Sequence, residues 1–325
     1  KDMTLEPISK KLSSLLNKKI LFNKKNINEL AIHEVNKIEN GSIMMLENIR
    51  FNEGEEKNDS NFAEKLSRFG EIYINDAFSC SHRAHASLVA ITKFLPSYFG
   101  IQIIEEINVL KKLTSEIKKP ISCIIGGSKI STKINVISNL IKKFDNIIIV
   151  GAMANTILKE KGSNIGKSLI ENNCKKIVDK IFKDLKKYNC NILYPSDVIV
   201  SKDKTSKGAE KEVKNIQNDD IILDIGTNTI STIKKIILNS NTIFWNGPVG
   251  YFENSFFENG TKQIANIIAE KTKNNKTFSV VGGGDTVTAI NKFNLFNSFT
   301  FVSTAGGAFL EFLEGKKLPG IKAIN

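Results

Sequence analysis

The chain has 325 residues, of which 41% are hydrophobic and 25% are charged. This composition is sufficient for a large buried core, and the length indicates about two domains. No apolar run approaches the roughly 18 residues of a membrane helix, and no signal-type apolar block opens the chain, so we expect no membrane partner and a cytoplasmic protein.

The formal net charge of +12 raises the question of nucleic-acid binding, because clustered Lys and Arg neutralise phosphates. The basic residues are spread along the whole chain without a stripe interleaved with aromatics, which favours a solvated lysine-rich surface and no specific nucleic-acid partner. The cysteines form no C-x-x-C pair and are expected to be reduced thiols: Cys80, Cys123, Cys174 and Cys190.

In the first third of the chain, short apolar runs alternate with segments of helical period. A helical pattern covers residues 8–16, and strands are predicted at 43–46 and 72–74, with a helix carried by residues 62–69 between them. We therefore expect two strands in this region.

A long, charged helical segment over residues 103–118 is expected to end before Pro120, because proline disfavours helix in the preceding residue. We place the connection between two domains there. Beyond it, strands are predicted at residues 121–125, 147–150, 191–194, 221–223, 242–245, 278–281 and 299–302. The alternation of strands and helices predicts an α/β protein with parallel sheets and helical crossovers.

Four of these strands lead into glycine-rich turns, which begin at Gly126, Gly151, Gly282 and Ser303. Because the carboxyl ends of parallel strands share one edge, the turns would place backbone N–H groups and helix N-termini on a common rim, where open sheets bind phosphorylated ligands. The chain lacks G-x-x-x-x-G-K-[ST], which excludes ordinary P-loop chemistry.

Arginine is rare in this chain and occurs at Arg50, Arg68 and Arg83. Where lysine is the default cation, an arginine indicates a site that needs a planar fork for a carboxylate or phosphate. Arg50 and Arg83 each follow a predicted strand, and His82 and His85 flank Arg83. The alternative is that both are surface ion-pair residues, as we expect for Arg68.

Four side chains beside the glycine-rich turns suit a nucleotide. Lys129 and Lys133 lie four residues apart across a turn into a helix, so both can face a polyphosphate. Asp285 follows a strand and three glycines, where a carboxylate can bind Mg²⁺ on phosphates, and Glu253 follows a rigid turn and could hold ribose hydroxyls. The alternatives are solvated lysines, an N-capping Asp and a solvated Glu.

The segments that carry these residues, and a few others, follow one another along the chain at 46–51, 55–59, 75–87, 126–133, 245–253, 282–286 and 313–320. Together they resemble the phosphoglycerate kinase family over essentially the whole chain. The resemblance implies two Rossmann-like α/β domains with parallel sheets joined by a connecting helix. The expected parts are an incomplete N-terminal domain over 1–105, an interdomain helix over 106–119, a nucleotide-binding domain over 120–305, and a C-terminal segment over 306–325 that packs back toward the first domain.

The resemblance also implies a hinge-bending monomer that transfers a phosphoryl group reversibly, with Mg²⁺, between ATP and the carboxylate of 3-phosphoglycerate. Arg50, His82 and Arg83 would bind 3-phosphoglycerate. Lys129 and Lys133 would be catalytic and would also hold the nucleotide phosphates. The further nucleotide-binding residues would be Glu253 at the ribose, Asp285 at the metal, and Gly282, Gly283, Gly284 and Thr286 at the phosphates.

The family normally opens with an Asp-x-Asn strand, a further arginine and a His-Leu-Gly-Arg loop, and this sequence instead opens at Lys1 with a helical pattern. We therefore expect that an N-terminal segment is missing and that the chain as given has little or no kinase activity. Two alternative functions stay open from the sequence: a catalytically inactive nucleotide-binding fragment of such a kinase and, less favoured, a nucleic-acid binder.

Overall fold

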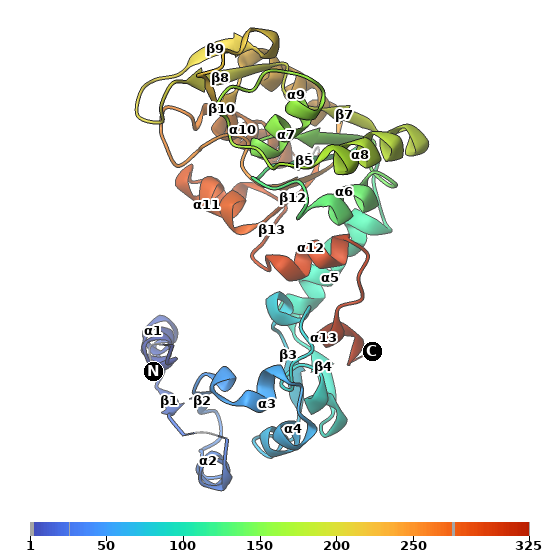
Figure 1. Ribbon diagram of the computed structural model, residues 1–325. Coiled ribbons are helices and arrows are strands. Elements are labelled where there is room, and N and C mark those ends of the chain that lie inside the picture. The colour runs from blue at the N-terminus through green and yellow to red at the C-terminus, as the bar shows by residue number, and fades with distance from the viewer. Residues whose placement is uncertain (1–2, 26, 275–276, 325) are drawn as a thin grey trace. The chain divides into compact units, whose positions relative to one another are not determined.

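The structure is a computed structural model that describes residues 3–25, 27–274 and 277–324, and it divides into two compact units (Figure 1). Unit 1 contains the chain up to Ile104 and again from Lys317 onward, and unit 2 contains Glu105–Lys316. Unit 2 is therefore longer than the predicted 120–305 domain, and the predicted 306–325 segment is divided between the two units.

Helix α5 (Ile101–Thr114) crosses the boundary between the units and ends earlier than predicted. The backbone amides of Ser115 and Glu116 both donate to the carbonyl of Lys111, at 2.8 and 2.9 Å, and this closes the helix well before Pro120. The charged residues that follow were predicted to continue the helix, and they lie instead in a turn and a segment without regular structure.

A six-stranded parallel sheet forms the centre of unit 2. From one edge to the other its strands are β13 (Phe301–Ser303), β12 (Phe278–Gly282), β11 (Thr242–Asn246), β5 (Ile121–Ile125), β6 (Asn146–Ile149) and β7 (Asn191–Leu193). Every residue of β5 and β11 is buried, as expected for central strands covered on both faces. The predicted parallel α/β architecture is confirmed here.

Side chains that alternate along the central strands supply two cores, one on each face of this sheet. Ile124, Trp245 and Val281 belong to one core, which is completed by isoleucines of the helices α9 (Thr227–Asn239), α10 (Asn259–Lys273) and α11 (Gly284–Lys292). On the other face Phe244 packs against Phe309, with ring centroids 5.7 Å apart. The further helices of unit 2 are α6 (Ile134–Leu140), α7 (Ala152–Glu160), α8 (Lys175–Tyr188) and α12 (Gly307–Leu313).

A second, antiparallel sheet in unit 2 departs from the prediction of parallel sheets. The predicted strand at 221–223 is part of β10 (Ile221–Ile225), which pairs antiparallel with β8 (Asp197–Ser201), and β8 pairs antiparallel with β9 (Ala209–Glu212). Strand β9 reads Ala-Glu-Lys-Glu and lies at a largely exposed edge, so it carried no apolar signal in the sequence.

Unit 1 contains two separate two-stranded parallel sheets. Strand β1 (Ile20–Asn23) pairs with β2 (Ile43–Leu46), and β3 (Tyr73–Asn75) pairs with β4 (Ser97–Phe99). The prediction of two strands in this region is therefore wrong, because the region contains four. Strands β1 and β4 were missed because they are short and follow two lysines and a proline, respectively. The helices of unit 1, besides the first residues of α5, are α1 (Glu6–Leu16), α2 (Glu29–Val35), α3 (Glu53–Glu56), α4 (Ser60–Ser67) and α13 (Pro319–Lys322).

The last residues of the chain pack on the loop that follows β3. The amide of Gly320 donates to the carbonyl of Ser81 at 2.9 Å, and the side chain of Asn75 donates to the carbonyl of Gly320 at 3.4 Å. Among the described residues, no helix combines the length and apolarity that crossing a membrane would require.

We expect the stability of the fold to fall as the pH rises from about 4.5 to 7, because of Glu106. This glutamate of α5 is buried and accepts a hydrogen bond from Ser303 Oγ at 3.0 Å, and burial raises its pKa from 4.5 to about 7. Within that window the folded state binds more protons than the unfolded state, so stability decreases with increasing pH.

Urea unfolding at pH 5 and pH 8 tests this. The native protein should lose about 1–3 kcal/mol relative to Glu106→Gln between the two pH values. Equal pH dependence in the two proteins would contradict the assignment.

Candidate active site

A cavity of about 500 Å³ lies in unit 2, where loops that follow several strands meet. Residues from the turns after β5, β6, β11 and β12 contribute to its lining: Gly127, Ser128, Gly151, Ala152, Pro248, Val249, Gly250, Tyr251, Glu253 and Asp285. The small antiparallel sheet supplies an apolar wall that includes Val198, Ile221, Ile222 and Leu223. Three of the four predicted glycine-rich turns therefore meet around this cavity, together with the turn after β11. No described residue of the fourth turn, which begins at Ser303, belongs to its lining.

The turns after β5 and β11 touch through their backbones. The amide of Gly126 donates to the carbonyl of Asn246 at 2.9 Å. A Cβ atom on Gly126 would lie 2.1 Å from the carbonyl oxygen of Pro248, and one on Gly247, where φ is +102°, would lie 2.3 Å from that of Gly126. Only glycine permits this approach, so these two positions fix the shape of the rim.

Lys133 is held against this rim by three oxygens. Its Nζ donates to the carbonyl of Gly126 and to Oδ1 of Asn246, both at 2.6 Å, and lies 3.4 Å from the carbonyl of Asn246. Burial lowers the pKa of Lys133 to about 8, against the opposing influence of Asp285. The lysine is thus fixed in place, and its pKa lies close to neutral pH.

Asn246 connects Lys133 to the next strand, and sequence reasoning missed it. Its Nδ2 donates to the carbonyl of Gly282 at 2.8 Å while its Oδ1 accepts from Lys133. A Cβ atom on Gly283, where φ is +93°, would lie 2.6 Å from this Nδ2. The signal was available, because Asn246 is a polar residue that directly follows the apolar run Ile243-Phe244-Trp245.

The residues around the start of α11 have two different roles. The exposed Asp285 lines the cavity, close to the N–H groups of the first turn, which lack partners within the helix. Thr286 is buried, and its Oγ1 accepts a hydrogen bond from the amide of Gly247 at 2.6 Å. Gly282 and Thr286 thus hold the turns in place, and Asp285 faces the cavity.

Asp224 is a second residue that sequence reasoning missed. It lies in β10, lines the cavity, and accepts hydrogen bonds from the amides of Gly260 at 2.6 Å and Ile225 at 2.9 Å. Burial raises its pKa to about 7. A carboxylate within an apolar strand was the available signal. Glu253, which was predicted, is exposed and lines the same cavity.

Lys129 is exposed and lies on the turn between β5 and α6. Its backbone carbonyl accepts a hydrogen bond from Thr132 Oγ1 at 2.9 Å. Of the described residues of this turn, Gly127 and Ser128 line the cavity and Lys129 does not. The turn therefore reaches the cavity, and its lysine extends into solvent.

In unit 1, Arg50 and Arg83 are both exposed, but one sheet does not bring them together. Arg50 follows β2 and Arg83 follows β3, and these strands belong to separate sheets. Nε of Arg83 donates to Nε2 of His82 at 3.4 Å. Arg68 forms the predicted surface ion pair, with Glu29 at 2.8 Å.

His85, which also flanks Arg83, is buried and helps to hold its loop. Its Nδ1 lies 3.7 Å from Oε1 of Glu55, which is itself buried. The same carboxylate accepts hydrogen bonds from the amide and the hydroxyl of Ser87, at 3.0 and 2.7 Å. The two histidines therefore differ, and His82 is the one beside the exposed arginine.

A family model for phosphoglycerate kinase matches residues 1–316. The chain belongs to the phosphoglycerate kinase family. The phosphoglycerate kinase of Wolbachia sp. subsp. Drosophila simulans (strain wRi) is 44% identical over 326 residues, which cover 100% of this chain and 82% of that relative. That of Bartonella quintana (strain Toulouse) is 42% identical, with the same coverage.

Solved phosphoglycerate kinase structures agree with this family. The structure from Coxiella burnetii has a TM-score of 0.89 at 38% identity and covers 100% of this chain and 81% of its own. The structure from Pyrococcus horikoshii OT3 has a TM-score of 0.85 at 28% identity, with 99% and 82% covered. The predicted α/β fold and the prediction of a kinase are confirmed. The comparisons support the kinase and not the alternative of an inactive fragment. That a segment is missing before Lys1 stays a prediction.

We expect the affinity for ADP to fall about tenfold as the pH rises from 7 to 9, because Lys133 has a lowered pKa of about 8 and loses its charge in this range. Calorimetry at pH 7, 8 and 9 measures this. Lys133→Arg keeps the charge and should flatten the pH profile, whereas Lys129→Arg should leave it unchanged. A steep profile in Lys133→Arg would show that another group titrates.

Proposed function

We propose that unit 2 binds Mg-ATP or Mg-ADP and that unit 1 binds 3-phosphoglycerate. The phosphoryl group then passes reversibly between ATP and the carboxylate of 3-phosphoglycerate. The observation that carries this proposal is the fixed Lys133, which Asn246 holds beside Gly127, and both Gly127 and Asp285 line the cavity. A cytoplasmic location and a monomeric state stay predictions.

The cavity offers a nucleotide three kinds of contact. The apolar wall, with Val198 and Leu223, suits a base, and Glu253 suits ribose hydroxyls as a hydrogen-bond acceptor. The phosphates would meet the charges of Lys129 and Lys133. They would also meet the backbone N–H groups at the start of α11, beginning from Gly283 and Gly284, where the helix dipole favours an anion.

Mg²⁺ fits this site through a single protein ligand. Asp285 supplies a carboxylate, the hard oxygen ligand that Mg²⁺ prefers, and Mg²⁺ commonly combines one or two carboxylates with substrate phosphates. Across the described ranges, no group of three or more His, Cys, Asp and Glu could hold a metal by itself. When bound, the ion would neutralise charge on the phosphate oxygens.

The reaction needs no general base, because the attacking carboxylate is already ionised at neutral pH. A carboxylate oxygen forms the new bond to the γ-phosphorus, and the oxygen that bridges the β- and γ-phosphates leaves with ADP. Lys129 and Lys133 would act by stabilising the charge that is distributed over the transferring group. In unit 1, Arg50 and Arg83 would bind 3-phosphoglycerate through their planar forks, with His82 beside Arg83.

Lys133→Ala should lower the affinity for Mg-ADP and reduce kcat/KM by about 10²–10³, because it removes a fixed charge at the transferring group. Asp285→Ala should weaken binding mainly when Mg²⁺ is present. Lys262→Ala, an exposed lysine of α10, is the matched control. Calorimetry with and without Mg²⁺ and a coupled assay measure these effects, and unchanged binding in both site variants would refute the nucleotide assignment.

Arg50→Lys and Arg83→Lys should each raise KM for 3-phosphoglycerate by about tenfold, because lysine cannot reproduce a bidentate fork. Mg-ADP binding should be unchanged in both. Arg68→Lys is the matched control, because it makes the same chemical change at an arginine that pairs with Glu29 and has no proposed contact with the substrate. If all three variants retain the native KM, the substrate does not bind through Arg50 and Arg83.

A further inference from the structure

The loop over residues 161–174, between α7 and α8, reaches two sides of the cavity. Lys167 and Leu169 line the cavity beside the apolar wall, and the side chain of Asn155 donates to the carbonyl of Leu169 at 3.2 Å. A few residues further on, Glu171 contacts the turn that carries Lys129. One short segment thus connects the base side of the cavity to its phosphate side.

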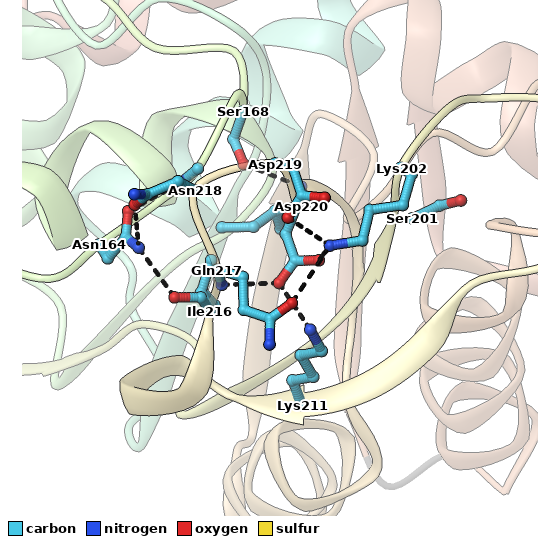
Figure 2. A network of polar contacts seen from close by, with 12 residues as sticks. Asn164, Ser168, Ser201, Lys202, Lys211, Ile216, Gln217, Asn218, Asp219 and Asp220 are labelled. Carbon is cyan, nitrogen blue, oxygen red and sulfur yellow. Dashed lines mark hydrogen bonds and ion pairs between the residues drawn. The ribbon is translucent and has the colours of Figure 1, made fainter.

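The first half of the loop is fixed by a polar network around Asp220 (Figure 2). The buried carboxylate of Asp220 accepts hydrogen bonds from Lys202 at 2.9 Å, Lys211 at 2.8 Å and the amide of Gln217 at 2.7 Å. Hydrogen bonds from the two lysines and from this amide outweigh burial and lower its pKa to about 2. The carboxylate is therefore ionised throughout the physiological range.

The loop is attached to this network by its backbone and side chains. The amide of Lys167 donates to the carbonyl of Asp220 at 2.7 Å, and Oγ of Ser168 accepts from the amide of Ile222 at 2.8 Å. Figure 2 shows Asn164 joined to the same segment, through the carbonyl of Ile216 at 2.9 Å. The first half of the loop therefore has a rigid base.

The second half of the loop ends at Glu171, which binds the turn between β5 and α6. Oε2 of Glu171 accepts from the amide of Ser131 at 3.0 Å, and Oε1 accepts from the hydroxyl of Ser131. These hydrogen bonds lower the pKa of Glu171, so the acceptor is charged. The amide of Glu171 itself donates to the buried Thr156 of α7 at 3.1 Å.

This contact matters because Lys129 is exposed and extends from a turn that includes Gly127, where φ is +122°. A long side chain on such a turn has many conformations available, and holding it in one conformation has an entropic cost. Charge-assisted hydrogen bonds from both groups of Ser131, two residues along, restrict the backbone from which Lys129 extends.

We propose that Glu171 is a positioning residue for phosphoryl transfer: by binding Ser131 it orients the turn that directs Lys129 toward the nucleotide phosphates. The Asp220 network fixes the base-side wall through the same loop. The inference rests on the proposed function, because it requires that a nucleotide occupies the cavity.

Calorimetry with ADP and with adenosine on Glu171→Ala and Asp220→Asn tests this. Glu171→Ala should weaken ADP binding about tenfold, because the charge of Lys129 would no longer be held in position at the phosphates. It should leave adenosine binding unchanged, because adenosine has no phosphates. Asp220→Asn should weaken both ligands in parallel. In the coupled assay Glu171→Ala should lower kcat by about 10–100-fold with KM for 3-phosphoglycerate unchanged. Asn172→Ala, an exposed neighbour, should match the native protein.

A double-mutant cycle with Ser131→Ala shows whether Glu171 acts through Ser131: the effect of Glu171→Ala should be smaller in the Ser131→Ala background. If Glu171→Ala does not fold, Glu171→Gln keeps one acceptor oxygen and should show a loss of about threefold for ADP alone. Equal losses of ADP and adenosine binding, or native behaviour of Glu171→Ala, would overturn the inference. A native protein that binds neither ligand would overturn the proposed function and this inference together.

Discussion

The side-chain amide of Asn246 joins three strand ends, and the rim of the cavity depends on it. Its oxygen accepts from Lys133 and its nitrogen donates to Gly282, so β11 fixes both the lysine that follows β5 and the turn that follows β12. A side chain on Gly126 or Gly247 would overlap the backbone of the other turn, so the turns after β5 and β11 are in direct contact. The charge of Lys133 therefore has one position relative to the start of α11.

The six-stranded sheet of unit 2 could be predicted from the sequence because its central parallel strands are mostly apolar and lead into glycine-rich turns. Strand β9 could not be predicted, since an exposed edge strand such as Ala-Glu-Lys-Glu has neither a hydrophobic period nor a hydrophobic face. Strands β1 and β4 were missed because of their neighbours in the sequence: two lysines precede β1, and Pro96 precedes β4, so neither segment stood out as an apolar run.

The candidate site shows the same division. Lys133, Glu253 and Asp285 were predicted because charged groups beside glycine-rich strand ends have a small number of uses. Asn246 and Asp224 were missed because their importance comes from hydrogen bonds to backbone groups far away in the sequence, such as Gly282 and Gly260. Thr286 was assigned to phosphates, and its hydroxyl is used to hold Gly247. Sequence identifies which residues are chemically able, and tertiary contacts decide which of them face the cavity.

The partial burial of Lys133 has a consequence for the lifetime of the protein. Its ammonium group is desolvated and compensated mainly by uncharged oxygens, so an anionic ligand would relieve an electrostatic cost that the empty protein carries. A ligand that binds only the folded state adds its binding free energy to the stability of that state. The cellular supply of nucleotide would then influence how often the chain opens, and the loaded form would be the more resistant to proteases.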